Sequence, residues 1–162
     1  MKVSNREKQK LRVPDFIRLF RFAIKVSQYI GKKKTFAILE QFIIESRLNW
    51  IKHNCRKIKR TKNPIDDAMH IFYNLNQGLD FKDAVVVKKT DKILITQWRN
   101  FCPVLEACKT LQLDTRQICK KIYHRPNQIF LAKINPNLKF KRNYKRIRPY
   151  ENYCEEVIEL KK

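Results

Sequence analysis

The spacing of the hydrophobic residues changes partway along this chain, and that change most limits the folds it can adopt. Up to about residue 78, apolar residues recur every three or four positions, as they do on one face of a helix. Segments 84–88 and 93–98 are instead short runs rich in Val and Ile, separated by polar residues, which is typical of a β-hairpin. The chain therefore predicts helices followed by a sheet.

Three helices are predicted in the first half. Pro14 suits the first turn of one helix, which Gly31 ends, and a second helix is expected over residues 33–53. Asn63 is followed by a proline and two aspartates, which supply a side-chain cap, a suitable first residue and first-turn acids. The third helix should therefore begin there and end near Gly78.

The second half predicts further helices and two more strands. Cys102 opens a short helix, Asp114 caps another, and segments 138–145 and 152–160 have the character of strands. This order fits an α+β domain in which N-terminal helices pack on a four-stranded, mostly antiparallel sheet. The later helices are inserted between two hairpin-like strand pairs.

The length of 162 residues fits a single domain with a buried core, and the 43% hydrophobic content argues against disorder. Residues 1–12 are charged and polar, and we expect them to form a basic mobile arm. Residues 13–162 are then one domain, helical over 13–78, with its sheet and remaining helices over 80–160.

The charge balance is strongly positive, with 37 Lys and Arg against 15 Asp and Glu and a formal net charge of +22. Such charge attracts polyanions over long range, although a lysine-biased proteome would also produce it. The two glycines do not form G-x-G-x-x-G or G-x-x-x-x-G-K-[ST], which excludes nucleotide binding through those motifs.

The start of the chain lacks the apolar core of a signal peptide, and no apolar run is long enough to cross a membrane. We therefore expect a cytoplasmic protein without a membrane partner. Its five cysteines are then expected to be reduced thiols or ligands rather than a disulfide framework.

Two clusters of cations are candidates for nucleic-acid binding. Residues 52–62 hold six cations and no acid, and residues 139–148 hold six more, with Tyr144 among them. Cations that pair with phosphates, beside aromatics that stack on bases, are typical of nucleic-acid interfaces. On a strand, the lysines of the second cluster would form one row; the alternative is an edge strand that lysines protect from aggregation. The candidate contact residues are Arg56, Lys57, Lys59, Arg60, Lys139, Lys141, Lys145 and Tyr144.

Cys102 is the leading candidate for covalent chemistry. If Pro103 is the first helical residue, Cys102 caps the helix, with its sulfur near unpaired N–H groups and the positive end of the dipole. That setting favours a thiolate, which attacks electrophiles or binds metal. Glu106, one turn on, is placed to orient a water or accept a proton. The alternative is a small buried cysteine beside a helix start.

His124 is a further catalytic candidate, because it precedes a helix break and lies close in sequence to Cys119. His70 lies in the middle of a predicted helix among apolar residues, where a packing role is expected. Cys108 is expected in the core, and Cys55 at a solvated helix end.

Four short motifs follow one another in the second half. They are a hairpin leading into Cys102-Pro103, Leu113-Asp114 before a helix containing Cys119, the segment 134–140, and a last strand entered through Cys154. Over about residues 80–160 their order and spacing resemble the L-2-amino-thiazoline-4-carboxylic acid hydrolase-like family of small α+β domains. The resemblance implies cysteine-dependent hydrolysis of a cyclic C–N bond.

The resemblance also puts Cys102, Cys119 and Cys154 at the family's cysteine positions, and so implies a shared thiol pocket for a small anionic ligand. Their spacings match none of the compact zinc patterns. The residues therefore predict no cofactor, although three thiols in one pocket leave a cysteine-bound metal open.

Two hypotheses remain. In the first, the protein is a small-molecule domain of that family, and the three sulfurs converge on one cavity. In the second, the same fold is an RNA- or DNA-binding module, and residues 52–62 and 139–148 form one continuous positive face. The resemblance favours the first. The charge, and the absence of a glycine that family members often carry before the last cysteine, favour the second.

Overall fold

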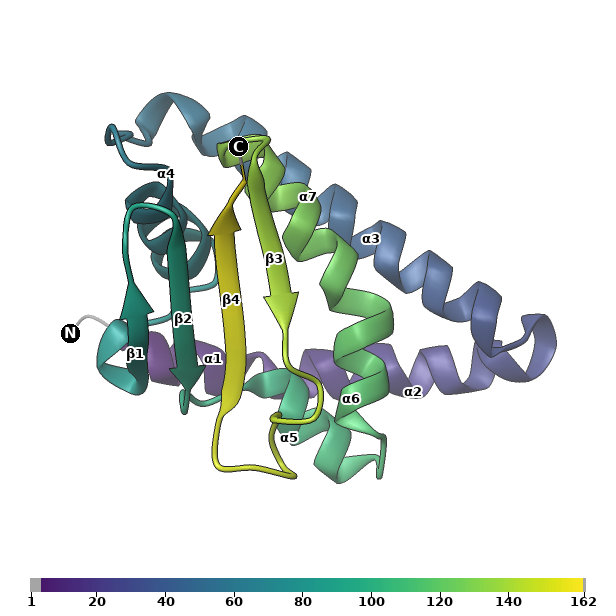
Figure 1. Ribbon diagram of the computed structural model, residues 1–162. Coiled ribbons are helices and arrows are strands. Elements are labelled where there is room, and N and C mark those ends of the chain that lie inside the picture. The colour runs from purple at the N-terminus through teal and green to yellow at the C-terminus, as the bar shows by residue number, and fades with distance from the viewer. Residues whose placement is uncertain (1–3, 162) are drawn as a thin grey trace.

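A computed structural model describes residues 4–161, without the side chain of Lys57. Its sheet consists of β1 (Ala84–Lys89), β2 (Ile93–Trp98), β3 (Leu138–Arg142) and β4 (Cys154–Leu160). The spatial order is β1-β2-β4-β3, and each of these pairings is antiparallel. Helices cover one face of this sheet (Figure 1), which confirms the predicted α+β class.

With the exception of the first, the helices begin and end close to the predicted positions. They are α1 (Asn5–Leu11), α2 (Val13–Ile30), α3 (Lys32–Asn54), α4 (Pro64–Asp67), α5 (Pro103–Thr110), α6 (Thr115–Ile118) and α7 (His124–Ile134). Helix α4 continues as the π-helical segment Ala68–Asn76, and the π-helical segment Cys119–Tyr123 joins α6 to α7. Short 3-10 turns occupy Cys55–Lys57 and Phe81–Asp83. None of the described helices has the length and apolar character needed to cross a membrane.

The helix ends follow from local chemistry. Gly31 has a φ of 82°, a left-handed value that glycine adopts without a steric penalty, and it separates α2 from α3. Asn63 caps α4 by accepting a hydrogen bond from Ile65 N, and Asp114 caps α6 by accepting one from Arg116 N.

Residues 5–11 form helix α1, where a basic arm was expected. Ser4 Oγ accepts a hydrogen bond from Glu7 N, while the Glu7 carboxylate accepts one from Ser4 N. Gln9 then donates to the backbone carbonyl of Gln77 at 2.7 Å, which ties α1 to the rest of the molecule. Residues 1–3 of the expected arm lie outside the described residues.

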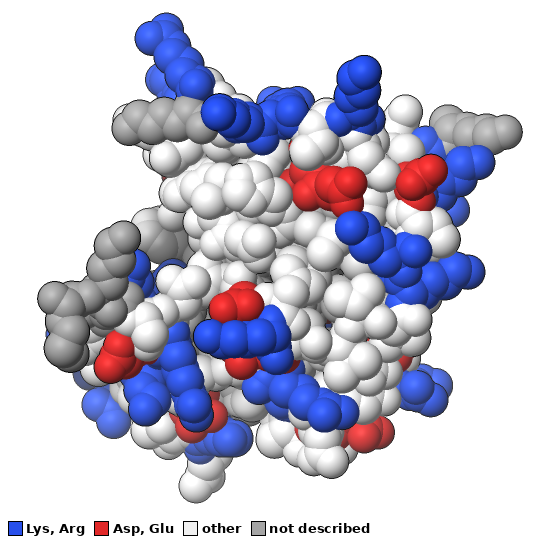
Figure 2. Space-filling model, turned by 90° about the vertical axis from the view of Figure 1, so that its left-hand side faces the viewer, with Lys and Arg blue, Asp and Glu red and all other residues white. Residues whose placement is uncertain are grey.

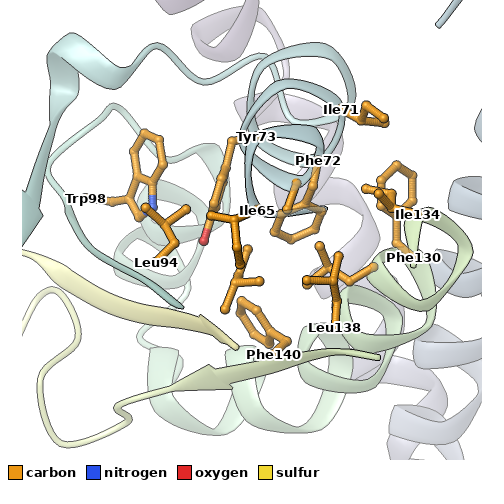
Figure 3. Close-up of a cluster of buried hydrophobic side chains, with 13 residues drawn as sticks. Ile65, Ile71, Phe72, Tyr73, Leu94, Trp98, Phe130, Ile134, Leu138 and Phe140 are labelled. Atoms are coloured by element: carbon orange, nitrogen blue, oxygen red, sulfur yellow. The ribbon is translucent and has the colours of Figure 1, made fainter. Parts of the chain in front are cut away.

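The apolar core consists of two clusters. The first lies between the covered face of the sheet, α4 with its π-helical continuation, and α7, and Figure 3 shows its side chains. In it, the Phe72 ring lies 5.7 Å from Phe130, and the Tyr73 ring lies 4.8 Å from Trp98, centroid to centroid. The second cluster lies between α2, α3, α5 and α6.

Candidate functional site

A cavity of about 580 Å³ is lined from both halves of the molecule. Helix α3 contributes Ile43, Arg47 and Trp50, while the sheet contributes side chains from β2, β3 and β4. Phe16 on α2, the first turn of α5 and the segment that runs from Cys119 into α7 also line it. The volume lies within the range of small-molecule binding pockets.

Cys102, Cys119 and Cys154 all line this cavity. Cys102 is the residue that precedes α5, Cys119 begins the π-helical segment before α7, and Cys154 is the first residue of β4. The three candidate pocket residues therefore line one cavity from separate parts of the chain. Cys108 lies in the second core cluster and Cys55 is exposed, as their sequence context suggests.

The thiols of Cys102 and Cys119 are neutral at physiological pH. Burial raises the pKa of the Cys102 thiol, and it raises the pKa of Cys119 to about 12. Cys102 does occupy the capping position of α5, but its sulfur accepts no capping hydrogen bond, and its loss of solvent outweighs the nearby helix N–H groups that favour the thiolate. Burial at Cys102 therefore favours the neutral thiol, whereas the sequence predicts a thiolate there.

Thiol labelling at pH 7 is expected to begin with a fast phase from the exposed Cys55. Alkylation needs the thiolate, so the raised pKa values of Cys102 and Cys119 slow these sites further. Iodoacetamide labelling followed by peptide mass spectrometry measures each rate, and Cys55→Ser should remove the fast phase. The slow phases should speed up about tenfold per pH unit while the thiols remain mostly protonated. Fast labelling of Cys102 at pH 7 would contradict this expectation and restore the thiolate hypothesis.

The other two catalytic candidates lie outside the cavity lining. Glu106 is partly exposed and pairs with Lys109 at 3.1 Å along the outside of α5. His124 Nδ1 forms a 2.8 Å hydrogen bond with the Tyr144 hydroxyl, and burial lowers its pKa. The structure does not bring these two side chains together with Cys102.

Arg47 is the most unusual group in the cavity. Its side chain is partly buried, its Nη1 is shielded from solvent without a hydrogen-bond partner, and it forms no ion pair with any described residue. The guanidinium lies 5.6 Å from the ring centre of Phe72 and 5.9 Å from that of Phe130. Burial lowers its pKa to about 10, so it remains a cation at neutral pH. A buried cation without a counter-charge is costly in a folded protein.

Five more polar atoms of the cavity-lining residues are buried without a partner among the described residues. They are Gln77 Nε2, Trp98 Nε1, Tyr123 Oη, Asn127 Oδ1 and Arg148 Nε. Asn127 is only 1% exposed. Each such group costs about 1–3 kcal/mol when it stays unsatisfied, so a cluster of them indicates a place where a ligand or water binds.

A second arginine in the cavity, Arg142, is fully paired. It forms a buried ion pair with Glu156, whose other carboxylate oxygen accepts a 2.9 Å hydrogen bond from the Tyr73 hydroxyl. Arg142 therefore differs from Arg47, because its charge is neutralised within the protein. No group of three or more described His, Cys, Asp or Glu side chains is placed to hold a metal ion.

The cation cluster at 139–148 is not the open row that the sequence predicts. Strand β3 ends at Arg142, so Tyr144 and Lys145 lie in the following turn and the strand alternation stops before them. Lys141 pairs with Glu159 at 2.9 Å, and Lys139 lies directly opposite Glu159 on β4. Strand β4 pairs with β3 as predicted, and its acidic side chains neutralise much of this cluster.

The cluster at 52–62 is more open. Lys52, Arg56 and Lys59 are exposed and form no ion pair among the described residues, while the side chain of Lys57 lies outside them. Arg60 donates instead to the backbone carbonyl of Ile134 at 2.9 Å, at the end of α7. On the face in Figure 2, Lys and Arg are spread around the molecule with Asp and Glu between several of them, rather than gathered in one patch.

Comparisons of the chain with models of known protein families, with curated proteins and with solved structures found no match.

Proposed function

We propose that this protein binds a small anionic molecule in its inner cavity, with Arg47 as the main contact. The observation that carries the proposal is the buried Arg47 Nη1, which has neither a hydrogen-bond partner nor a counter-ion among the described residues. An anionic ligand would supply both, and charge-assisted hydrogen bonds are the strong ones.

The start of helix α5 supports the same proposal. Cys102, Val104 and Leu105 line the cavity, so the N-terminal end of the helix opens onto it. The first N–H groups of a helix have no partner within it, and they carry the positive end of the helix dipole. They would add to the attraction that Arg47 exerts on an anion.

The proposal agrees with the expected thiol pocket for a small anionic ligand, and it concerns binding rather than hydrolysis. Opening a cyclic C–N bond through Cys102 would need a thiolate and a proton acceptor beside it. Among the described residues lining the cavity, the only carboxylate is Glu156, and Arg142 and Tyr73 already engage it.

The test is a thermal unfolding experiment with a panel of carboxylates at constant ionic strength. A ligand that binds only the folded protein raises the unfolding temperature in proportion to ln(1 + [L]/Kd). We expect a saturable rise for the native protein and none for Arg47→Met. The exposed Arg21, on α2 and outside the cavity lining, gives the matched control Arg21→Met. Equal rises in all three proteins would contradict the proposal.

Nucleic-acid binding through residues 52–62 is the second candidate, because Lys52, Arg56 and Lys59 are exposed cations without an acidic partner among the described residues. Binding of mixed oligonucleotides should then weaken steeply as salt increases, and the slope should fall by about one unit for each phosphate-contacting cation removed. A gel-shift series with Lys52→Gln, Arg56→Gln and Lys59→Gln measures this. Lys141→Gln is the control, because Lys141 is paired with Glu159. No binding at low salt, or binding that ignores salt, would contradict it.

A further inference from the structure

The size of the cavity limits the kind of anion that it takes. A lone carboxylate or phosphate would occupy only a small part of about 580 Å³. Much of the remaining wall is apolar, and it includes Phe16, Ile43, Trp50, Val104 and Leu105. Small-molecule sites usually combine such apolar walls with a few polar groups that orient the ligand. A carboxylate or phosphate without an apolar body would leave these walls facing water.

The arginines of the cavity locate the charged end of the ligand. Arg142 is already paired with a glutamate, and Arg12 is exposed to solvent. Arg148 forms no ion pair among the described residues and its Nε has no partner, but its Nη1 donates to the backbone carbonyl of Asn100. Arg47 has a buried, unpartnered Nη1 and neither an ion pair nor a side-chain hydrogen bond among the described residues. Of the arginines that are not exposed, Arg47 is therefore the one left most free to bind an anion.

The polar and apolar parts of the wall are also arranged along one helix. Ile43, Arg47 and Trp50 are spaced four and three residues apart on α3 and all line the cavity, so they form one stripe on its surface. A ligand whose charged end meets Arg47 therefore has apolar wall on both sides along the helix. The unpartnered hydroxyl of Tyr123 belongs to the same lining and can donate to the charged end.

We propose that the ligand is an amphipathic carboxylate, with its carboxylate bound at Arg47 and an aliphatic or aromatic body against Phe16, Ile43 and Trp50. This inference rests on the proposed function and narrows it to one ligand class. Acetate and inorganic phosphate, which lack such a body, then bind weakly, whereas medium-chain carboxylates bind well.

The protein carries its own reporter for this test. Both of its two tryptophans, Trp50 and Trp98, line the cavity. Titration with acetate, hexanoate and decanoate, at constant ionic strength and below the micelle concentration, should change the tryptophan fluorescence. We expect the affinity to rise about fourfold for each buried methylene. Decanol, which has the body without the charge, should bind about tenfold more weakly than decanoate or worse.

A pair of variants on α3 tests the location of the body. Ile43→Phe adds bulk to the cavity wall and should weaken decanoate binding by about fourfold for each methylene that it excludes. Ile38→Phe is the matched control, because Ile38 is 57% exposed on the same helix and lies outside the cavity lining. It should leave decanoate binding unchanged.

The outcomes separate this inference from the proposed function. If affinity does not depend on chain length but binding is still lost in Arg47→Met, the inference of an amphipathic ligand is overturned. The proposed anion binding then stays in place. Three outcomes would overturn both the amphipathic ligand and anion binding at Arg47. They are equal affinities for decanol and decanoate, decanoate binding that Arg47→Met does not weaken, and no fluorescence change with any carboxylate. Equal effects of Ile43→Phe and Ile38→Phe overturn the assignment of the body to this wall.

Discussion

Arg47→Met is expected to make the ligand-free protein more stable and at the same time unable to bind carboxylates. Methionine preserves the contacts with Phe72 and Phe130, because its thioether packs well against aromatic rings. It removes a guanidinium whose Nη1 is buried without a partner. Replacing buried charge by apolar groups often stabilises a protein, and we expect about 1–2 kcal/mol here because the side chain is only partly buried.

Differential scanning fluorimetry without ligand measures this gain, which corresponds to a rise of about 3–6 °C in the unfolding temperature for a domain of this size. Arg21→Met, at an exposed position, should change it by less than about 0.5 kcal/mol in free energy. A gain in stability together with a loss of binding identifies Arg47 as a residue kept for its ligand. A loss of stability in Arg47→Met would contradict this, since it would make the arginine a structural element.

Glu156→Gln is expected to cause the largest loss of stability of any substitution considered, about 3–5 kcal/mol. Glutamine preserves the shape of the side chain but leaves Arg142 as a buried cation without a counter-charge. It also replaces a carboxylate acceptor of the Tyr73 hydroxyl by a neutral group. Urea unfolding at pH 7, followed by circular dichroism, measures the change in free energy.

Glu159→Gln is the matched control, because Glu159 lies on the same strand in more exposed pairs with Lys141 and Lys161. Surface pairs of this kind contribute less than about 1 kcal/mol. The double variant with Arg142→Met and Glu156→Leu should recover much of the loss, because no unpaired charge remains. Similar losses for Glu156→Gln and Glu159→Gln would show that the ion pair of Arg142 contributes little.

Much of the fold was predictable because its elements are set by local chemistry. Gly31 separates two helices, Asn63 and Asp114 cap others, and the Val- and Ile-rich runs pair as β1 and β2. Helix α1 was missed although the Ser4 and Glu7 spacing of a capping box is visible in the sequence. The charged and polar composition of residues 1–12 favoured a mobile arm instead.

The polar part of the site was not predictable in the same way. Arg47 had one local signal, since it lies between Ile43 and Trp50 on the apolar stripe of a predicted helix. Arg142 had no such signal, because the register that places Glu156 opposite it on β4 arises only in the folded chain. The grouping of the three cysteines was expected from a family resemblance, not from their spacing.

The most direct test of an anion-binding cavity is a crystal structure of the complex with 10-bromodecanoate. The anomalous signal of bromine locates the end of the body, and the electron density locates the carboxylate. We predict the carboxylate within hydrogen-bonding distance of the Arg47 guanidinium, and the bromine inside the cavity against its apolar wall. A ligand seated on the outer surface, or a carboxylate in the cavity that does not contact Arg47, would contradict the proposal.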